Sequence, residues 1–327
     1  MHMSDTLISP AVAVATSIVA AALVVVATRK IGRTERHNTT RLIPLMGVMG
    51  ALVFAAQMLN FAIPATGSSG HIVGGVLLAA VLGEWAGFLT LTSVIHPGQE
   101  IALSGGSAAA APASAAPAAA SHTVVAGDTL WCLVAYPLIL KPLIHNHNSP
   151  ARWAAASIAT SITALAMGAL AVTIETELSG ITALPYGRFL SFMLPIHLLI
   201  GVGEGLATAA VIASLRRYRP DLLFDSTEPT ARPRTQFIAI TVVAALLVAS
   251  VAGTVASSRP DGLEWSIERT TAGVEIAESQ SPLHHRAARI QRTTALLPDY
   301  EASMAGLVGV GATLAVGYGL SLLIRRR

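Results

Sequence analysis

Long runs of apolar residues alternate with short polar stretches over most of this 327-residue chain. A helix needs about 20 apolar residues to cross a bilayer, at about 1.5 Å of rise per residue. Runs of that length lie at 9–28, 42–63, 153–174, 189–215, 236–256 and 303–323. A further apolar region, 72–95, is broken by Gly83-Glu84-Trp85, which predicts a short crossing, a turn and a helix that starts back.

Two apolar stretches are too short for a full crossing. Residues 84–95 and 129–140 each supply only about 12 apolar-rich residues, and a low-complexity Ala/Pro/Ser linker at 105–121 lies between them. We therefore expect an all-α polytopic membrane protein. Its helical bundle has about seven crossings, two of them truncated, and a C-terminal two-helix module follows.

Basic residues orient these spans. They cluster after the first run, after 189–215 and at the end of the chain, at Arg29, Lys30, Arg33, Arg36 and Arg41, at Arg216, Arg217 and Arg219, and at Arg325, Arg326 and Arg327. Because Lys and Arg mark cytoplasmic loops, the pattern predicts a multi-pass protein of the cell membrane with its N-terminus outside and its C-terminus in the cytoplasm. Loop 64–71 then returns to the outside, so Met1, His2 and His71 share one outer face.

Composition agrees with a membrane protein and removes several function classes. Hydrophobic residues make up 53% of the chain and charged residues 12%, about half the charged share of a soluble domain. The one cysteine, Cys132, excludes a disulfide framework and a thiolate-rich metal site. No basic patch is interleaved with aromatic residues, so nucleic-acid binding is not expected.

The first residues carry the chemistry of a metal chelate. No basic segment precedes the first apolar run, so we expect no signal peptide, and the bulky His2 favours retention of Met1. The Met1 amine, the deprotonated His2 amide and the His2 imidazole can then bind one ion in a plane, with His71 in the fourth position. Four planar nitrogens suit Ni(II), Cu(II) and, less strictly, Co(II), whereas zinc prefers a tetrahedral site. The alternative is a solvated terminal histidine and a loop histidine that binds nothing.

Four polar residues in the apolar runs are candidates for supporting this site. Gln57 and Asn60 lie near the outer end of the second run, where hydrogen bonds from them would hold the N-terminal segment in place. His197 and Glu204 are seven residues apart, and hence on one helical face. Ionisable residues in a span are functional candidates, but ordinary contacts between helices are an equal alternative for all four.

Three segments resemble a known family. They read MHMSDTLISPAV, IPLMGVMGALVFAAQMLNFAIPATGSSGHIVGGVLLAAVLGEWAGFLTLTSV and FMLPIHLLIGVGEGLATAAVIASLRRYRP. They are similar to the CbiM/NikM substrate-binding component of nickel/cobalt energy-coupling-factor transporters. The C-terminal SSRPDGLEWSIE, TTALLPDY and GLVGVG resemble the small CbiN/NikN-type subunit, which indicates a fused NikMN-type chain.

The resemblance implies a transport function without enzymatic activity of the chain itself. Its implied cargo is Ni(II) or Co(II), ligated by Met1, His2 and His71. Its implied partners are a transmembrane energy-coupling protein and cytoplasmic ATPase subunits, in addition to membrane lipid. The chain contains no GxxxxGK[ST] sequence that would let it hydrolyse ATP through a P-loop.

The chain departs from the family pattern at about 96–131. Within this insert, SHTVVAGDTLW resembles the opening of a LysM glycan-binding repeat, of which only about a quarter is present. Two alternative functions follow: a membrane scaffold that has lost transport because the insert disrupts the bundle, and an envelope-anchoring protein. The expected domains are a metal-binding transmembrane domain at 1–220, a cytoplasmic linker at 221–235 and a CbiN/NikN-like module at 236–327 with an outer loop at 258–302.

Overall fold

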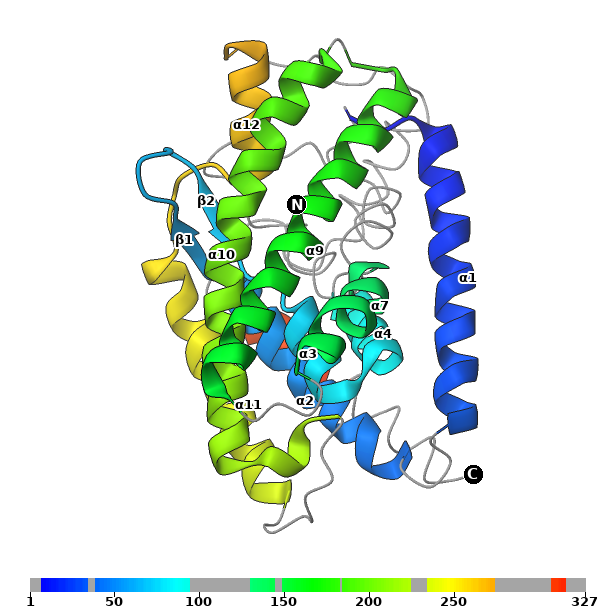
Figure 1. Cartoon of the computed structure of the whole chain (residues 1–327), viewed down its shortest axis with the longest axis vertical. Helices are drawn as coiled ribbons and strands as arrows, with labels where there is room; N and C mark the ends of the chain where they lie inside the picture. The colour runs from blue at the N-terminus through cyan, green and yellow to red at the C-terminus, as the bar shows by residue number, and fades with distance from the viewer. Residues whose placement is uncertain are drawn as a thin grey trace.

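The computed structural model describes residues 7–34, 39–94, 130–144, 149–182, 184–224, 234–273 and 307–315. Within these ranges the elements are helices, apart from one small hairpin (Figure 1). Three described helices are long and apolar enough to cross a membrane: α1 (Pro10–Thr34), α9 (Pro150–Ser179) and α10 (Tyr186–Tyr218). Shorter apolar helices occupy Leu42–Gln57, Leu133–Ile144 and Thr235–Val251. The predicted class, a helical polytopic membrane protein, is confirmed.

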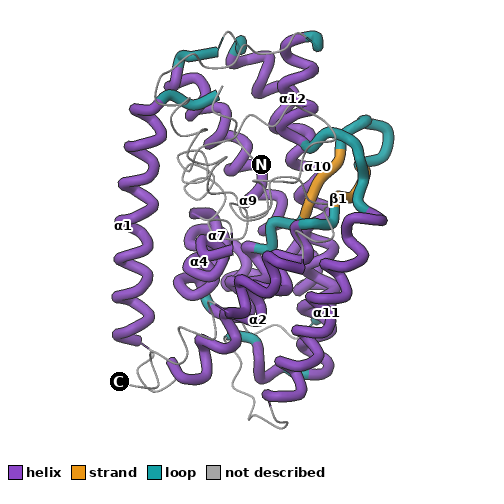
Figure 2. Tube along the Cα trace, turned by 180° about the vertical axis from the view of Figure 1, so that it is seen from behind, coloured by secondary structure: helices purple, strands orange, loops and turns teal. Residues whose placement is uncertain are grey.

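Apolar side chains cover much of the outer surface of this bundle. Helix α1 stands at one edge (Figure 2) and exposes Val14, Ile18 and Val19. Helix α11 (Arg234–Val255) likewise exposes Ile240 and Leu247. Exposing such apolar surfaces to water would be unfavourable, whereas contact with lipid is favourable. The helices can lie in lipid because their backbone hydrogen bonds are made internally.

Glycines allow α9 and α10 to pack closely against each other. A Cβ built on Gly205 would lie 2.5 Å from the Cα of Ile158, and one on Gly201 would lie 2.7 Å from the Cα of Ile162. Small residues at these positions let the two backbones approach, which maximises van der Waals contact where no hydrophobic effect drives helices together. Among the described elements, α9 and α10 share the most extensive contact.

The second apolar run does not remain helical to residue 63. Helix α2 (Thr39–Gln57) ends early, and strands β1 (Asn60–Ala62) and β2 (Ser69–His71) form an antiparallel hairpin. The expectation of one continuous span over 42–63 is therefore wrong at its outer end. The backbone of 60–62 forms hydrogen bonds with 69–71 in place of helical hydrogen bonds. The periodicity of apolar residues does not reveal this pairing.

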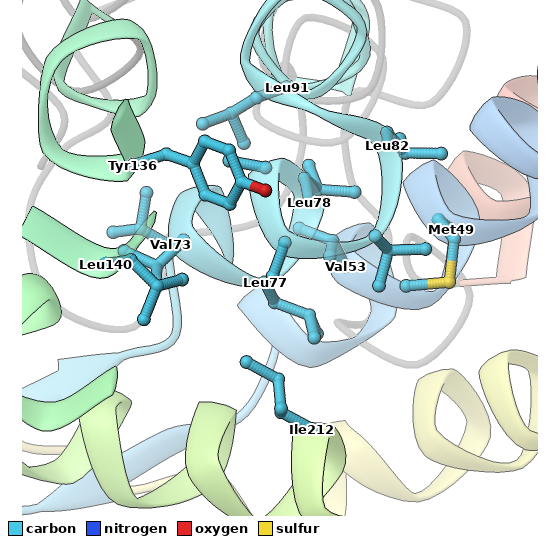
Figure 3. Packing of buried hydrophobic residues seen from close by; sticks show 14 of the residues in the cluster. Met49, Val53, Val73, Leu77, Leu78, Leu82, Leu91, Tyr136, Leu140 and Ile212 are labelled. Atoms are coloured by element: carbon cyan, nitrogen blue, oxygen red, sulfur yellow. The ribbon is translucent and has the colours of Figure 1, made fainter. Parts of the chain in front are cut away.

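A buried helix fills the centre of the bundle. Helix α3 (Gly75–Leu82) is buried along its whole length, and α4 (Glu84–Ser93) starts back after Gly83, which confirms the predicted turn. Gly83 has φ +83°, and a Cβ there would lie 2.6 Å from the ring of Phe224. Figure 3 shows the cluster around α3, formed by Met49, Val53, Val73, Leu77, Leu78, Leu82, Leu91, Tyr136, Leu140 and Ile212.

The short stretch after the insert also joins this cluster. Helix α7 (Leu130–Ala135), the π-helical turn η3 (Tyr136–Leu140) and α8 (Lys141–Ile144) follow one another without a break. Pro137 supplies no backbone N–H, a cause of local disturbance in an α-helical ladder. Most of the predicted insert, 96–129, lies outside the described residues.

The C-terminal module packs on the N-terminal domain at two places. Helix α11 lies along α2, where Phe54, Ala245 and Val310 share one buried cluster, the last of these from the helical stretch 307–315. Helix α12 (Gly262–Thr271) packs on α10. The expected outer loop therefore contains a helix, which begins with a capping box formed by Asp261 and Glu264. A 3₁₀ turn, η4 (Pro220–Leu222), follows α10.

Replacing Gly205 with Ala should destabilise the bundle, although Gly to Ala normally favours a helix. The added Cβ would meet the backbone of α9, so we expect the free energy of unfolding to fall by about 1–3 kcal/mol. Thermal unfolding of the detergent-solubilised chain measures this. Gly187→Ala in the same helix is the control, because a Cβ there meets nothing within 4 Å. Equal stability of the two variants would show that α9 and α10 do not pack as described.

Candidate functional site

The hairpin places His71 beside α10. In its register Asn60 pairs with His71, Phe61 with Gly70 and Ala62 with Ser69. Gly70 has no space for a side chain, because a Cβ would lie 2.8 Å from Ile200. The end of the predicted loop 64–71 is thus one strand of a hairpin that packs against α10. Figure 1 shows both strands next to α10, in the half of the molecule that also holds α12.

Two buried polar side chains anchor the backbone that follows His71. The Glu204 carboxylate accepts hydrogen bonds from the Val73 amide at 3.2 Å and from the Gly74 amide at 3.0 Å. Gln57 donates through Nε2 to the Val73 carbonyl at 2.9 Å. Glu204 is 2% exposed, so the carboxylate needs these bonds in place of water. For Glu204 the structure gives a role that the sequence had left open: it fixes the turn after β2.

His197 lies on the same face of α10, one helical turn beyond the contact with Gly70. Its Nδ1 is 2.7 Å from the Met193 carbonyl, and since a carbonyl only accepts, Nδ1 is the donor. In the neutral ring Nε2 then carries the lone pair. A Cβ built on Gly262 would lie 3.1 Å from this Nε2, so the start of α12 is seated directly on the imidazole.

A small cavity opens between these elements. Its volume is about 10 Å³, which accommodates about one water-sized sphere. The lining residues come from β2 and the turn after it, from α9, from α10 and from the start of α12: Gly70, His71, Val73, Leu165, His197, Ile200, Asp261 and Gly262. Both histidines thus border one space, and the C-terminal module contributes part of its wall.

The segment before α12 holds the hairpin through backbone and side-chain hydrogen bonds. The Ser69 amide donates to the Pro260 carbonyl at 2.8 Å, and the Ser69 hydroxyl donates to the Arg259 carbonyl at 2.8 Å. Trp265 donates through Nε1 to the Thr66 carbonyl at 3.0 Å. Sequence reasoning missed these contacts. Its only signal was the SSRPDGLEW segment, which had no stated role in the site.

The predicted site residues are brought together in part. His71 and His197 line the cavity, and Gln57 lies behind it on the Val73 carbonyl. Asn60 stands opposite His71 in the hairpin, and its carbonyl accepts from the Ser257 amide at 2.8 Å. Met1 and His2 lie outside the described residues. Among the residues described, no group of three or more His, Cys, Asp or Glu side chains is close enough to hold a metal ion.

Comparison with known proteins decides the family. Residues 2–108 and 128–222 match CbiM, described as the cobalt uptake substrate-specific transmembrane region. This chain belongs to the CbiM family. Its residues 235–326 match the PDGLE domain, and the unmatched stretch 109–127 lies inside the predicted insert.

Fused relatives resemble this CbiM-family chain along most of its length. A protein of Archaeoglobus fulgidus named as a fused nickel transport protein, NikMN, is 27% identical over 303 residues, 89% of this chain and 90% of the relative. One of Lactiplantibacillus plantarum named as a fused nickel transport protein, LarMN, is 28% identical over 341 residues, 99% and 93% of the two chains. The predicted kinship with a fused CbiM/NikM-type component is confirmed.

A solved structure shares the fold. The crystal structure of a truncated transition metal transporter superposes with a TM-score of 0.51 at 22% identity, over 67% of this chain and 99% of that one. Such a likeness supports the fold alone. The family and the similarity to transport proteins indicate a membrane protein of metal uptake.

Replacing Glu204 with Gln should loosen the turn after His71. Both carboxylate oxygens accept from backbone amides, so the Gln side chain would turn an NH2 group toward one of these donors. A buried N–H without an acceptor costs about 1–3 kcal/mol, and the free energy of unfolding should fall by that amount. Thermal unfolding in detergent measures it, with the exposed Glu177→Gln on α9 as the control. If Glu204→Gln unfolds like the parent chain, the anchor is unimportant.

Proposed function

We propose that this chain is the substrate-capture component of an ATP-driven nickel/cobalt importer. The observation that carries the proposal is the position of His71: it borders a cavity of about one-ion size, on a hairpin held by α10, Glu204 and the C-terminal module. A ligand held on several sides is preorganised for an ion, because little entropy is lost when the ion binds. The relatives named as nickel transport proteins support nickel as a cargo, and the cobalt-uptake family supports cobalt.

In this proposal four nitrogens bind the ion in a plane. They are the Met1 amine, the His2 amide nitrogen, the His2 imidazole and His71, a set that suits Ni(II) and Co(II) better than zinc. The described residues by themselves do not provide enough ligands, which is consistent with the remainder coming from Met1 and His2. Gln57, Asn60 and His197 would support the ligands: Gln57 by fixing Val73, Asn60 by pairing with His71, and His197 by shaping the cavity.

The ion would enter from outside the cell. Near the C-terminal ends of α1 and α10, basic side chains stack on aromatic rings of neighbouring elements, whereas near the hairpin Arg269 stacks on Trp265. Lys30 lies over Trp85, Arg216 over Trp153 and Arg219 over Phe237, from 4.5 to 5.9 Å from the ring centroids. Lys and Arg concentrate on the cytoplasmic side of membrane proteins. This supports an outer location for His71, with the N-terminus outside and the C-terminus in the cytoplasm.

Energy would come from other subunits. We assign 1–220 to the metal-binding domain, 221–235 to a cytoplasmic linker and 236–327 to the CbiN/NikN-like module. The partners in this proposal are a transmembrane energy-coupling protein and cytoplasmic ATPases. Family membership and the full-length similarity to fused nickel transport proteins support an assembly of this kind.

Extending the N-terminus by two residues, Gly-Ser before Met1, should abolish high-affinity Ni(II) binding. The amine would then lie too far from the His2 imidazole to close the fused chelate rings. We expect Kd to rise at least about hundredfold, and a similar rise for His71→Ala. Titration of purified full chain with Ni(II), after its N-terminal residue has been checked by mass spectrometry, measures both. A Gly-Ser extension after Arg327 is the control.

A one-residue extension provides a second, opposite test. Gly before Met1 creates an amine, two amides and the His2 imidazole in one plane, a complete four-nitrogen chelate that no longer needs His71. Binding to that variant should therefore become insensitive to His71→Ala. If the two-residue extension binds Ni(II) as tightly as the parent chain, the N-terminal chelate is wrong.

A further inference from the structure

Asp261 brings the C-terminal module into the cavity that holds the two histidines. Among the described residues that line this cavity, it is the only acidic one. It is also the residue before α12, so its position depends on where that helix docks. A residue at the start of a helix usually caps that helix. The position of Asp261 in the cavity wall suggests an additional role.

Close contacts fix the start of α12 against α10. A Cβ on Gly262 would lie 2.8 Å from the Cδ1 of Ile200 and 2.9 Å from the Cε1 of His197, so only glycine allows this approach. Leu263 is 1% exposed, in a cluster with Met193. Trp265 is tied to Thr66 by its indole N–H and meets the ring of Phe192 edge-on. These contacts leave α12 little freedom to move Asp261 out of the cavity wall.

The Asp261 carboxylate is itself held in a fixed orientation. Its Oδ1 accepts from the Leu263 amide at 2.8 Å and from the Glu264 amide at 2.9 Å. Glu264 returns a contact, accepting from the Asp261 amide at 3.3 Å. Amide donors and the positive end of a helix favour the ionised carboxylate. The cavity wall therefore carries a fixed negative charge.

His197 borders the same cavity as Asp261. The ring is 2% exposed and its Nδ1 is used by the Met193 carbonyl. Its Nε2 lies on the side of Gly262, the residue that follows Asp261. His197 and Asp261 therefore meet at the wall of one cavity.

Charge balance then gives Asp261 a role. In the proposed site a divalent ion meets one anionic ligand, the deprotonated His2 amide, and neutral imidazole and amine nitrogens. The complex retains one positive charge. An uncompensated charge in a water-poor pocket is costly, so a fixed anion in the wall of the pocket stabilises the occupied site.

We propose that Asp261 is the counter-charge to the captured dication, contributed by the C-terminal module to a site whose ligands lie in the N-terminal domain. The inference rests on the proposed function. Asp261 acts on the ion through space and is not one of its ligands, which agrees with the absence of a three-residue metal cluster among the described residues. Of the other nearby carboxylates, Glu204 binds the amides of Val73 and Gly74, and neither Glu204 nor Glu264 lines the cavity.

The test uses purified full chain titrated with Ni(II) alone. Asp261→Asn and Asp261→Ser both remove the charge while keeping a good helix cap. We expect Kd to rise at least about tenfold in each, while the metal-free chain keeps its Tm within about 2 °C. Glu268→Gln removes the same charge from an exposed position of the same helix and should leave Kd within about twofold of the parent value.

The outcomes separate the two hypotheses. If the parent chain binds no Ni(II), the proposed function fails. If it binds and both Asp261 variants bind equally well, the counter-charge fails while the function stands. Three further results would also overturn the counter-charge. The first is a loss of affinity in only one of the two Asp261 variants, and the second is a loss of affinity that always accompanies a lower Tm of the metal-free chain. The third is an equal loss of affinity in Glu268→Gln.

Discussion

Non-helical backbone inside a helical membrane bundle needs hydrogen-bond partners from the protein, because neither lipid nor apolar side chains supply them. The turn between β2 and α3 is such a stretch, and the Glu204 carboxylate accepts from two of its consecutive amides. Gln57 completes the arrangement by donating to the Val73 carbonyl. With the turn fixed, β2 on one side and the buried α3 on the other are fixed too. The position of His71 thus depends on the Glu204 carboxylate, which is distant in sequence but adjacent in space.

Helix α10 organises the site because its functional positions share one face. His197, Ile200, Gly201 and Glu204 follow one another at helical spacing. Gly201 lets α9 approach, whereas Ile200 receives the hairpin at Gly70 and α12 at Gly262. One helical face therefore contacts α9, the hairpin and the C-terminal module. A change in the tilt of α10 would therefore disturb all three contacts together.

The covalent fusion of the two modules matters for the cavity. The segment from Ser257 to Trp265 pairs with the hairpin and supplies Asp261 and Gly262 to the cavity wall. Because both parts are in one chain, the effective concentration of the second module near the first is high without a separate binding step. The C-terminal module is thus a structural part of the site, in addition to being a pair of hydrophobic helices.

The order of apolar and charged residues along the sequence determined most helices, the break at Gly83 and the basic clusters that follow the spans. It also placed His197 and Glu204 on one helical face. These features could be predicted because apolar periodicity and charge are properties of residues close together in the chain. The sequence also carried the family resemblance, while the N-terminal chelate stays a prediction, since Met1 and His2 lie outside the described residues. Only the tertiary structure decided that α2 ends at Gln57, that 60–62 and 69–71 form a hairpin, that Glu204 holds the turn after His71, and that Asp261 reaches the cavity. These depend on contacts between residues as far as 199 positions apart, and such pairings leave no periodic pattern in either segment.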